Sequence, residues 1–90
     1  MPVVRIPSSM RHFSANRSEL TAEGDTLGAL LVDLERQCPG IRTRLLDDKG
    51  EVRRFLNIYV GDQDIRYLQA LQTPLRASDE VSIIPAIAGG

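Results

Sequence analysis

The chain has 90 residues, of which 42% are hydrophobic and 26% are charged, and its net charge is −1 at pH 7. This size and composition are typical of one small globular domain, and they argue against an intrinsically disordered chain. The net charge gives no general basic surface for nucleic acid or an anionic membrane, and no apolar run approaches the roughly 20 residues of a membrane span. Because the first residues also lack the apolar core of a signal peptide, we expect a cytoplasmic protein that folds as a single domain over residues 1–90.

Cys38 and His12 are the only cysteine and histidine in the chain. A single cysteine forms neither an internal disulfide nor, by itself, a zinc or iron–sulfur site. Cys38 closes the apolar stripe of a predicted helix, which favours a buried structural thiol, and His12 is predicted to lie on the surface. The sequence contains no recognisable nucleophile–base pair, ligand cluster or phosphate-binding loop. We therefore expect a protein that is not an enzyme and that binds no cofactor or metal of its own.

The first quarter of the chain predicts two strands. Residues 2–7 alternate, with Val4 and Ile6 on one face, and residues 17–23 form a more weakly patterned strand. A polar loop over residues 8–16 connects them.

Residues 27–37 carry the clearest helical pattern. Asp25 or Thr26 supplies the N-cap oxygen, and Pro39-Gly40 ends the helix. The apolar positions recur at the spacing of one helix face: Leu27, Leu30, Leu31, Leu34 and Cys38. This helix is predicted to contribute most to the hydrophobic core.

The second half of the chain predicts a short helical turn over residues 41–46 and a loop over residues 47–50. Two strands follow over residues 54–60 and 64–66, and a long connection over residues 67–79 leads to the last strand, residues 81–84. One amphipathic helix must bury its apolar stripe against one sheet. The sequence therefore predicts an α+β domain in which a mixed sheet of four to five strands packs on one main helix.

Strand alternation also assigns the sheet face that points away from the helix. If Leu56 and Ile58 meet the helix, Phe55 and Tyr59 point outward, and the same logic places Ile84 outward in the last strand. Two aromatic side chains and an isoleucine on an open sheet face are candidates for a partner-binding patch. The alternative is that loops cover them.

The chain ends with Glu80-Val-Ser-Ile-Ile-Pro-Ala-Ile-Ala-Gly-Gly90, an apolar strand followed by an extended tail over residues 84–90 without a charged side chain. Pro85 lacks an N–H group, so the strand is predicted to stop there. Gly89 and Gly90 have no Cβ, which lets their backbone approach another surface closely. Chain ends are often functionless, so the glycine pair gains weight only on a compact domain. On such a domain, it predicts a carboxylate that is presented to other proteins.

Three segments carry a resemblance to a known family: Gly24-Asp-Thr-Leu-Gly28 before and into the helix, Asn57-Ile-Tyr-Val60 with Gly61-Asp62, and the tail described above. They are spread along the chain, which over nearly its whole length resembles the MoaD/ThiS family of ubiquitin-like β-grasp sulfur carriers. Within that family, Arg54-Phe-Leu-Asn-Ile-Tyr-Val60, Asp62, Asp64 and the Pro-Ala-Ile-Ala-Gly-Gly ending look most like the CysO-type carriers of cysteine biosynthesis.

The resemblance implies a function for the tail. In this family, an E1-like (MoeB/ThiF-type) activating enzyme uses ATP and magnesium to adenylate the terminal glycine, here Gly90 beside Gly89. A sulfurtransferase or persulfide donor then supplies sulfur and leaves a thiocarboxylate. The thiocarboxylate gives sulfide to a cysteine synthase-like enzyme, and a JAMM-type metallopeptidase releases the product. The side chains expected to bind these partners are Phe55, Tyr59, Ile84, Pro85, Ile87 and Ala88.

Three alternatives remain open at this point. The sulfur acceptor could be molybdopterin, thiamine, tRNA or a specialised metabolite instead of a cysteine precursor. The chain could also be a ubiquitin-like protein modifier, which shares the adenylation step and ends in a bond to lysine. A non-catalytic interaction module with an idle tail is the third alternative.

Overall fold

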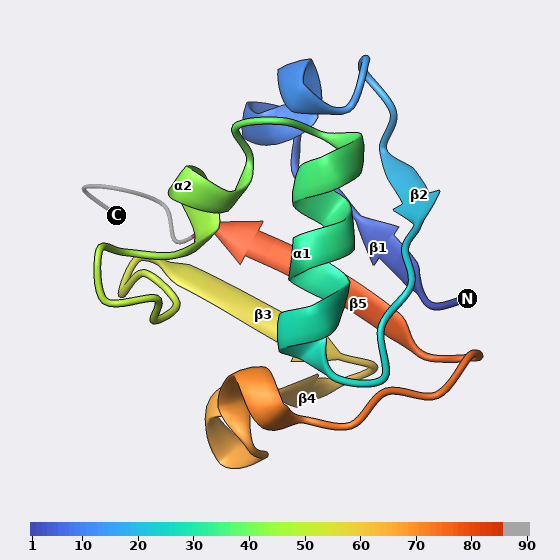
Figure 1. The fold of residues 1–90 in the computed structure, drawn as a ribbon, viewed down its shortest axis with the longest axis vertical. Coiled ribbons are helices and arrows are strands. Elements are labelled where there is room, and N and C mark those ends of the chain that lie inside the picture. Colours follow the sequence, from blue (N-terminus) through green and yellow to red (C-terminus); the bar gives the residue numbers. More distant parts are fainter. Residues whose placement is uncertain (86–90) are drawn as a thin grey trace.

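The computed structural model describes residues 1–85, in which five strands form one mixed sheet and one long helix crosses a face of that sheet (Figure 1). The strands are β1 (Val3–Arg5), β2 (Glu19–Thr21), β3 (Leu56–Val60), β4 (Gln63–Asp64) and β5 (Glu80–Pro85). The helices are α1 (Leu27–Gln37) and α2 (Arg42–Leu45), with 3-10 turns η1 (Ser8–Phe13), η2 (Ile65–Tyr67) and η3 (Ala70–Gln72). The predicted α+β class, with the sheet packed on one main helix, is confirmed.

The last strand of the chain lies in the middle of the sheet. The strand order is β2-β1-β5-β3-β4, with β5 parallel to β1 and antiparallel to β3. In this register Val81 lies opposite Val4 of β1, and Ile83 lies opposite Ile58 of β3. Both edges of β5 are therefore hydrogen-bonded over much of its length, which fixes the strand that leads into the tail.

Helix α1 begins and ends where the sequence predicts. The Thr26 hydroxyl accepts a hydrogen bond from the Ala29 N–H at 3.2 Å, so Thr26 is the N-cap. The approach to the helix is so close that a Cβ on Gly24 would overlap the backbone of Leu30, which explains a glycine at that position. All five predicted stripe residues are buried: Leu27, Leu30, Leu31, Leu34 and Cys38.

The hydrophobic core fills the space between α1 and the sheet. Alternating residues on the strands and directly beside them contribute to it: Val4, Ile6, Leu20, Ala22, Leu56, Ile58, Val81 and Ile83. Val60, the third inward position of β3, is only half-buried. Ile41 and Leu45, at the start and end of α2, are fully buried and attach that short helix to the same core.

The strands predicted over residues 2–7, 17–23 and 54–60 are shorter in the structure, at Val3–Arg5, Glu19–Thr21 and Leu56–Val60. Two further segments also differ from the prediction. The strand predicted over residues 64–66 is limited to Gln63–Asp64, because the Asp64 carboxylate accepts the backbone N–H of Arg66 at 2.9 Å and starts η2. Residues 8–16, predicted as a loop, contain η1, which buries Met10. None of these differences changes the layers of the fold.

Candidate functional site

The tail leaves the sheet from the end of β5. Pro85 is paired with Leu56 of β3 and is part of the strand, so the predictions that the strand stops before Pro85 and that the tail begins at residue 84 are wrong. The reason lies in the neighbouring strands. Pairing of β5 with β1 ends at Ser82, opposite Arg5, so Pro85 has a partner strand on one side only, where a sheet tolerates proline.

The predicted tail residues Ile87, Ala88, Gly89 and Gly90 lie outside the described residues, so their predicted roles stay predictions. What the structure gives is the point from which they start. Pro85 is held by β3 at one corner of the molecule, next to α2 (Figure 1).

Two of the predicted partner-binding side chains, Phe55 and Ile84, lie toward this end of β3 and β5, whereas Tyr59 lies toward the opposite end of β3. Phe55, just before β3, is 71% exposed, and Ile84 of β5 is 47% exposed. Tyr59 is half-buried and pairs with Ser82, two positions before Ile84. The predicted outward orientation of Phe55 and Ile84 agrees with their exposure. Their role in binding a partner stays a prediction.

A cleft of about 410 Å³ adjoins Pro85. It is lined by side chains from η1, α2 and the start of β3: Met10, Thr43, Arg44, Arg53, Phe55, Leu56 and Pro85. The Arg53 Nε–H donates a hydrogen bond to the Thr43 carbonyl at 2.8 Å, which ties the segment before β3 to α2. The cleft thus joins two predicted partner-binding residues, Phe55 and Pro85, to two arginines that the sequence analysis did not single out.

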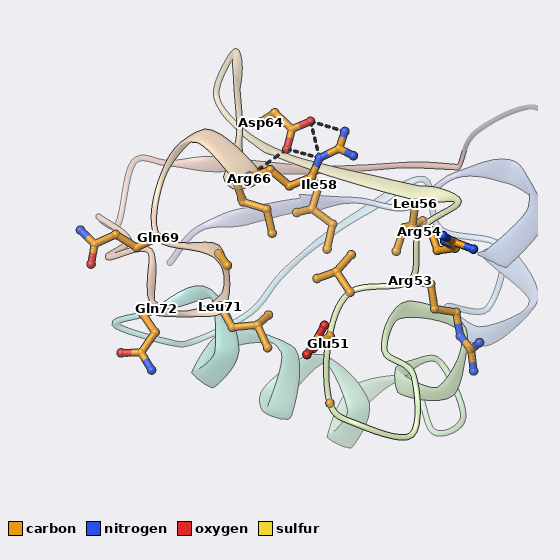
Figure 2. Close-up of a pocket in the computed structure, with 14 residues that line it drawn as sticks. Glu51, Arg53, Arg54, Leu56, Ile58, Asp64, Arg66, Gln69, Leu71 and Gln72 are labelled. Carbon is orange, nitrogen blue, oxygen red and sulfur yellow. Dashed lines mark hydrogen bonds and ion pairs between the residues drawn. The ribbon is translucent and has the colours of Figure 1, made fainter.

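An ordered polar cluster lies on the outer side of β3 and β4 and was also missed. The Asp64 carboxylate is almost fully buried and accepts hydrogen bonds from Arg66 Nε and Nη2, the latter at 2.8 Å (Figure 2). Arg66 Nη2 also donates to Asn57 Oδ1 at 2.7 Å. These bonds hold the pKa of Asp64 below its usual range. The Asp-x-Arg spacing after a hairpin turn is a weak signal for this pair in the sequence.

A second cavity, of about 390 Å³, lies on the helix side of the sheet (Figure 2). Its apolar walls include Leu56, Ile58, Ile65 and Leu71, which belong to the core or pack on it. Its polar lining residues, which include the Asp64–Arg66 pair, do not form a nucleophile–base pair. The cavity therefore offers no evident chemistry of its own.

The two residues with reactive side chains have structural surroundings. Burial raises the pKa of the Cys38 thiol, which is 1% exposed and packs in the core, as predicted. His12 is exposed, with its ring centre 4.1 Å from that of Phe13. Among residues 1–85, no three histidine, cysteine or carboxylate side chains are grouped as metal ligands. In the same part of the chain, no helix is long and apolar enough to cross a membrane.

Comparisons with known proteins address the whole chain. The ThiS family model matches residues 4–90. The chain is 44% identical to the sulfur carrier protein CysO of Mycobacterium tuberculosis over 89 residues, which are 97% of this chain and 96% of the relative. It superposes with a TM-score of 0.94 on a chain of the Amycolatopsis orientalis BexX/CysO complex, at 32% identity and 100% coverage of both chains.

A third similar protein has a different name. The solution structure of small archaeal modifier protein 1 from Methanosarcina acetivorans superposes with a TM-score of 0.81 and 28% identity, over 98% of this chain and 94% of that one. The family match, the near-complete coverage and the strand order agree with one another. This chain belongs to the ThiS family and has the ubiquitin-like β-grasp fold.

Proposed function

We propose that this chain is a cytoplasmic sulfur carrier that works through the carboxylate of Gly90. The observation that carries the proposal is the extent of the family match, which runs through residue 90 and so includes the diglycine. The similar protein CysO, which is named a sulfur carrier, has nearly the same length. The central position of β5 supports the proposal, because it gives the tail a rigid starting point.

The proposed chemistry takes place in partner enzymes. An E1-like (MoeB/ThiF-type) enzyme binds ATP and magnesium and joins the Gly90 carboxylate to AMP, with release of pyrophosphate. A sulfurtransferase or other persulfide donor then attacks the carbonyl carbon and displaces AMP, which gives an acyl disulfide. A thiol reduces this disulfide and leaves a thiocarboxylate. A narrow site that excludes water protects the acyl-adenylate from hydrolysis, and glycine residues let the chain end enter such a site. The carrier itself supplies no acid, base or metal to these steps.

The resemblance to CysO-type carriers favours cysteine biosynthesis as the destination of the sulfur. In this route, the sulfur of the Gly90 thiocarboxylate displaces the leaving group of an activated serine on a cysteine synthase-like enzyme, which joins the new cysteine to Gly90 through a thioester. The thioester rearranges to an amide with the cysteine nitrogen, and a JAMM-type metallopeptidase hydrolyses that amide to release cysteine and the Gly90 carboxylate. Binding of these partners is assigned to Phe55, Tyr59, Ile84, Pro85, Ile87 and Ala88. The exposure of Phe55 and Ile84 and the shared cleft of Phe55 and Pro85 support this assignment.

Intact-mass measurement tests the proposal. The chain is incubated with the activating enzyme of its own organism, ATP, magnesium and a sulfide donor. Exchange of one oxygen for sulfur raises the mass by about 16 Da, and a variant without Gly89 and Gly90 shows no increase. Absence of the heavier species with the full chain, while the enzyme activates another carrier, would refute the proposal.

Protein modification is a second candidate function, favoured by the structural similarity to the archaeal modifier protein. It uses the same adenylate, but the carboxyl group ends on a lysine amine of another protein. The chain itself carries ten arginines and one lysine, Lys49, which limits attack on its own activated end. Conjugates of high mass in cell extracts that disappear on removal of Gly89 and Gly90 would establish this function.

A further inference from the structure

Four arginines lie on the two segments that border the cleft beside Pro85, and we call them the arginine collar: Arg42, Arg44, Arg53 and Arg54. The first two lie on α2 and the other two immediately precede β3. Arg44 and Arg53 line the same cleft as Pro85. All four are exposed, and Figure 2 shows Arg53 and Arg54 at the end of β3 remote from the Asp64–Arg66 pair.

The backbone beneath the collar is well fixed. The Glu35 carboxylate accepts the N–H groups of Gly40 and Arg42, each at 2.9 Å, and so attaches the start of α2 to the end of α1. The Arg53 N–H donates to the Leu45 carbonyl at 3.0 Å, while its side chain bonds the Thr43 carbonyl. The two collar segments are therefore joined to each other, and they present their charges from a rigid base.

The collar charges lack ion-pair partners among residues 1–85. The arginines that form ion pairs there are Arg5, Arg36 and Arg66, and the cleft beside Pro85 is lined by no carboxylate. Two carboxylates lie close enough to respond to the collar charges. The pKa of Glu35 is lowered chiefly by backbone hydrogen bonds and in part by the charge of Arg42, and the pKa of Asp47 is lowered chiefly by backbone hydrogen bonds and in part by the charge of Arg53. Glu35 is already occupied by the N–H groups of Gly40 and Arg42. Asp47 Oδ1 already accepts the N–H groups of Lys49 and Glu51.

The collar is positively charged, whereas the chain as a whole has a net charge of −1 and residues 85–90 carry no charged side chain. Five residues beyond Pro85 span at most about 17 Å when fully extended, so the collar lies well outside the reaction centre that Gly90 reaches. At physiological ionic strength, charges act over about 8 Å, which is the range of a contact between facing surfaces.

We propose that the arginine collar docks on carboxylate side chains that border the entrance through which the activating enzyme takes residues 86–90. The inference rests on the proposed sulfur-carrier function and adds the chemistry of the partner surface. The uncharged tail supplies reach but no long-range attraction, whereas the collar supplies steering and orientation. A polyanion such as RNA fits this corner less well, because Asp47, Asp48 and Glu51 lie on the adjoining loop.

Charge reversal tests the docking. The variant Arg44→Glu/Arg53→Glu is compared with Arg17→Glu/Arg76→Glu, which changes the net charge equally at arginines outside the cleft. The variant Arg42→Glu/Arg44→Glu repeats the test without loss of the Arg53 hydrogen bond. The measurement is ATP–pyrophosphate exchange by the activating enzyme as a function of carrier concentration, at low and high salt, with circular dichroism as the check of folding.

We expect both collar variants to lower kcat/KM by about tenfold or more at low salt, through KM and not kcat, and to flatten its salt dependence. Arg44→Lys/Arg53→Lys keeps the charge and is expected to retain most of the activity. Equal behaviour of the collar and control variants would overturn the inference and leave the sulfur-carrier function intact. Absence of exchange with the unaltered chain would overturn both. Salt-sensitive binding of tRNA that the collar variants lose, with exchange unaffected, would replace the protein partner by a nucleic acid.

Discussion

Ile83 and Ile84 are adjacent residues of β5, and the same substitution at each position separates the two faces of the sheet. Ile83 lies opposite Ile58 and is 3% exposed on the side of α1, whereas Ile84 lies opposite Asn57 and is 47% exposed. We predict that Ile83→Asp prevents stable folding and that Ile84→Asp does not.

The magnitudes follow from burial. Full burial of an isoleucine side chain stabilises a fold by about 1.5–3 kcal/mol, and Ile83→Asp loses nearly all of this. An unpartnered polar group in the core costs about 2–7 kcal/mol more. The sum is comparable with the whole stability of a small domain, about 5–15 kcal/mol. Because Ile84 is already half exposed, Ile84→Asp costs about 1 kcal/mol or less.

Urea unfolding followed by circular dichroism measures both changes, with Ile84→Ala and Ile83→Val as mild controls. For the folded Ile84→Asp variant, we also expect weaker binding to the activating enzyme, seen as a higher KM in ATP–pyrophosphate exchange. Comparable destabilisation by the two aspartates would refute the assignment of faces. A normal KM for Ile84→Asp would remove Ile84 from the partner-binding surface.

Three further predictions concern the stability and burial of groups in the folded domain. Arg66 lowers the pKa of folded Asp64 below its unfolded value of about 3.9, so the stabilisation is present above that pH and is lost as the pH falls through the lowered folded value. Asp64→Asn is therefore expected to lower the free energy of unfolding at pH 7, with a difference that shrinks toward pH 2 in urea titrations; a constant difference would contradict this. Thr26→Ala is expected to cost about 1 kcal/mol through loss of the α1 N-cap, measured in the same way, and an unchanged midpoint would show that the cap contributes nothing. The Cys38 thiol is expected to react with Ellman's reagent only after unfolding, and fast reaction of the native chain would contradict its burial.

The fold could be predicted from periodicity because each pattern had one dominant period. The α1 stripe repeats at helical spacing from Leu27 to Cys38, and β3 alternates from Leu56, so the boundaries of α1 and the buried faces of both elements follow from local rules. The inclusion of Pro85 in β5 could not be predicted in this way, because a strand accepts a proline most readily where one neighbouring strand is absent, and here pairing with β1 stops at Ser82. Where that pairing stops depends on the whole sheet and is not encoded in the residues around Pro85.

The site was predicted only in part for a related reason. Exposure of Phe55 and Ile84 follows from alternation, because each has buried neighbours in sequence. The collar combines residues 42–44 with residues 53–54, which are joined through the Arg53–Thr43 hydrogen bond. The polar cluster of Asp64 and Arg66 likewise depends on a residue from another strand, because Arg66 also donates a hydrogen bond to Asn57 of β3. Arginines spread through a sequence of low net charge give no local signal that they meet at one corner.

The central claim is that Gly90 is the chain end at which sulfur is carried. The most direct measurement is mass spectrometry of the protein recovered from its own cells, with fragmentation of the C-terminal peptide. We expect a chain that ends at Gly90, with a fraction of molecules that carry sulfur in place of one oxygen at that residue. A chain that continues beyond Gly90, or a Gly90 carboxylate without sulfur even when cysteine supply depends on this protein, would contradict the central claim.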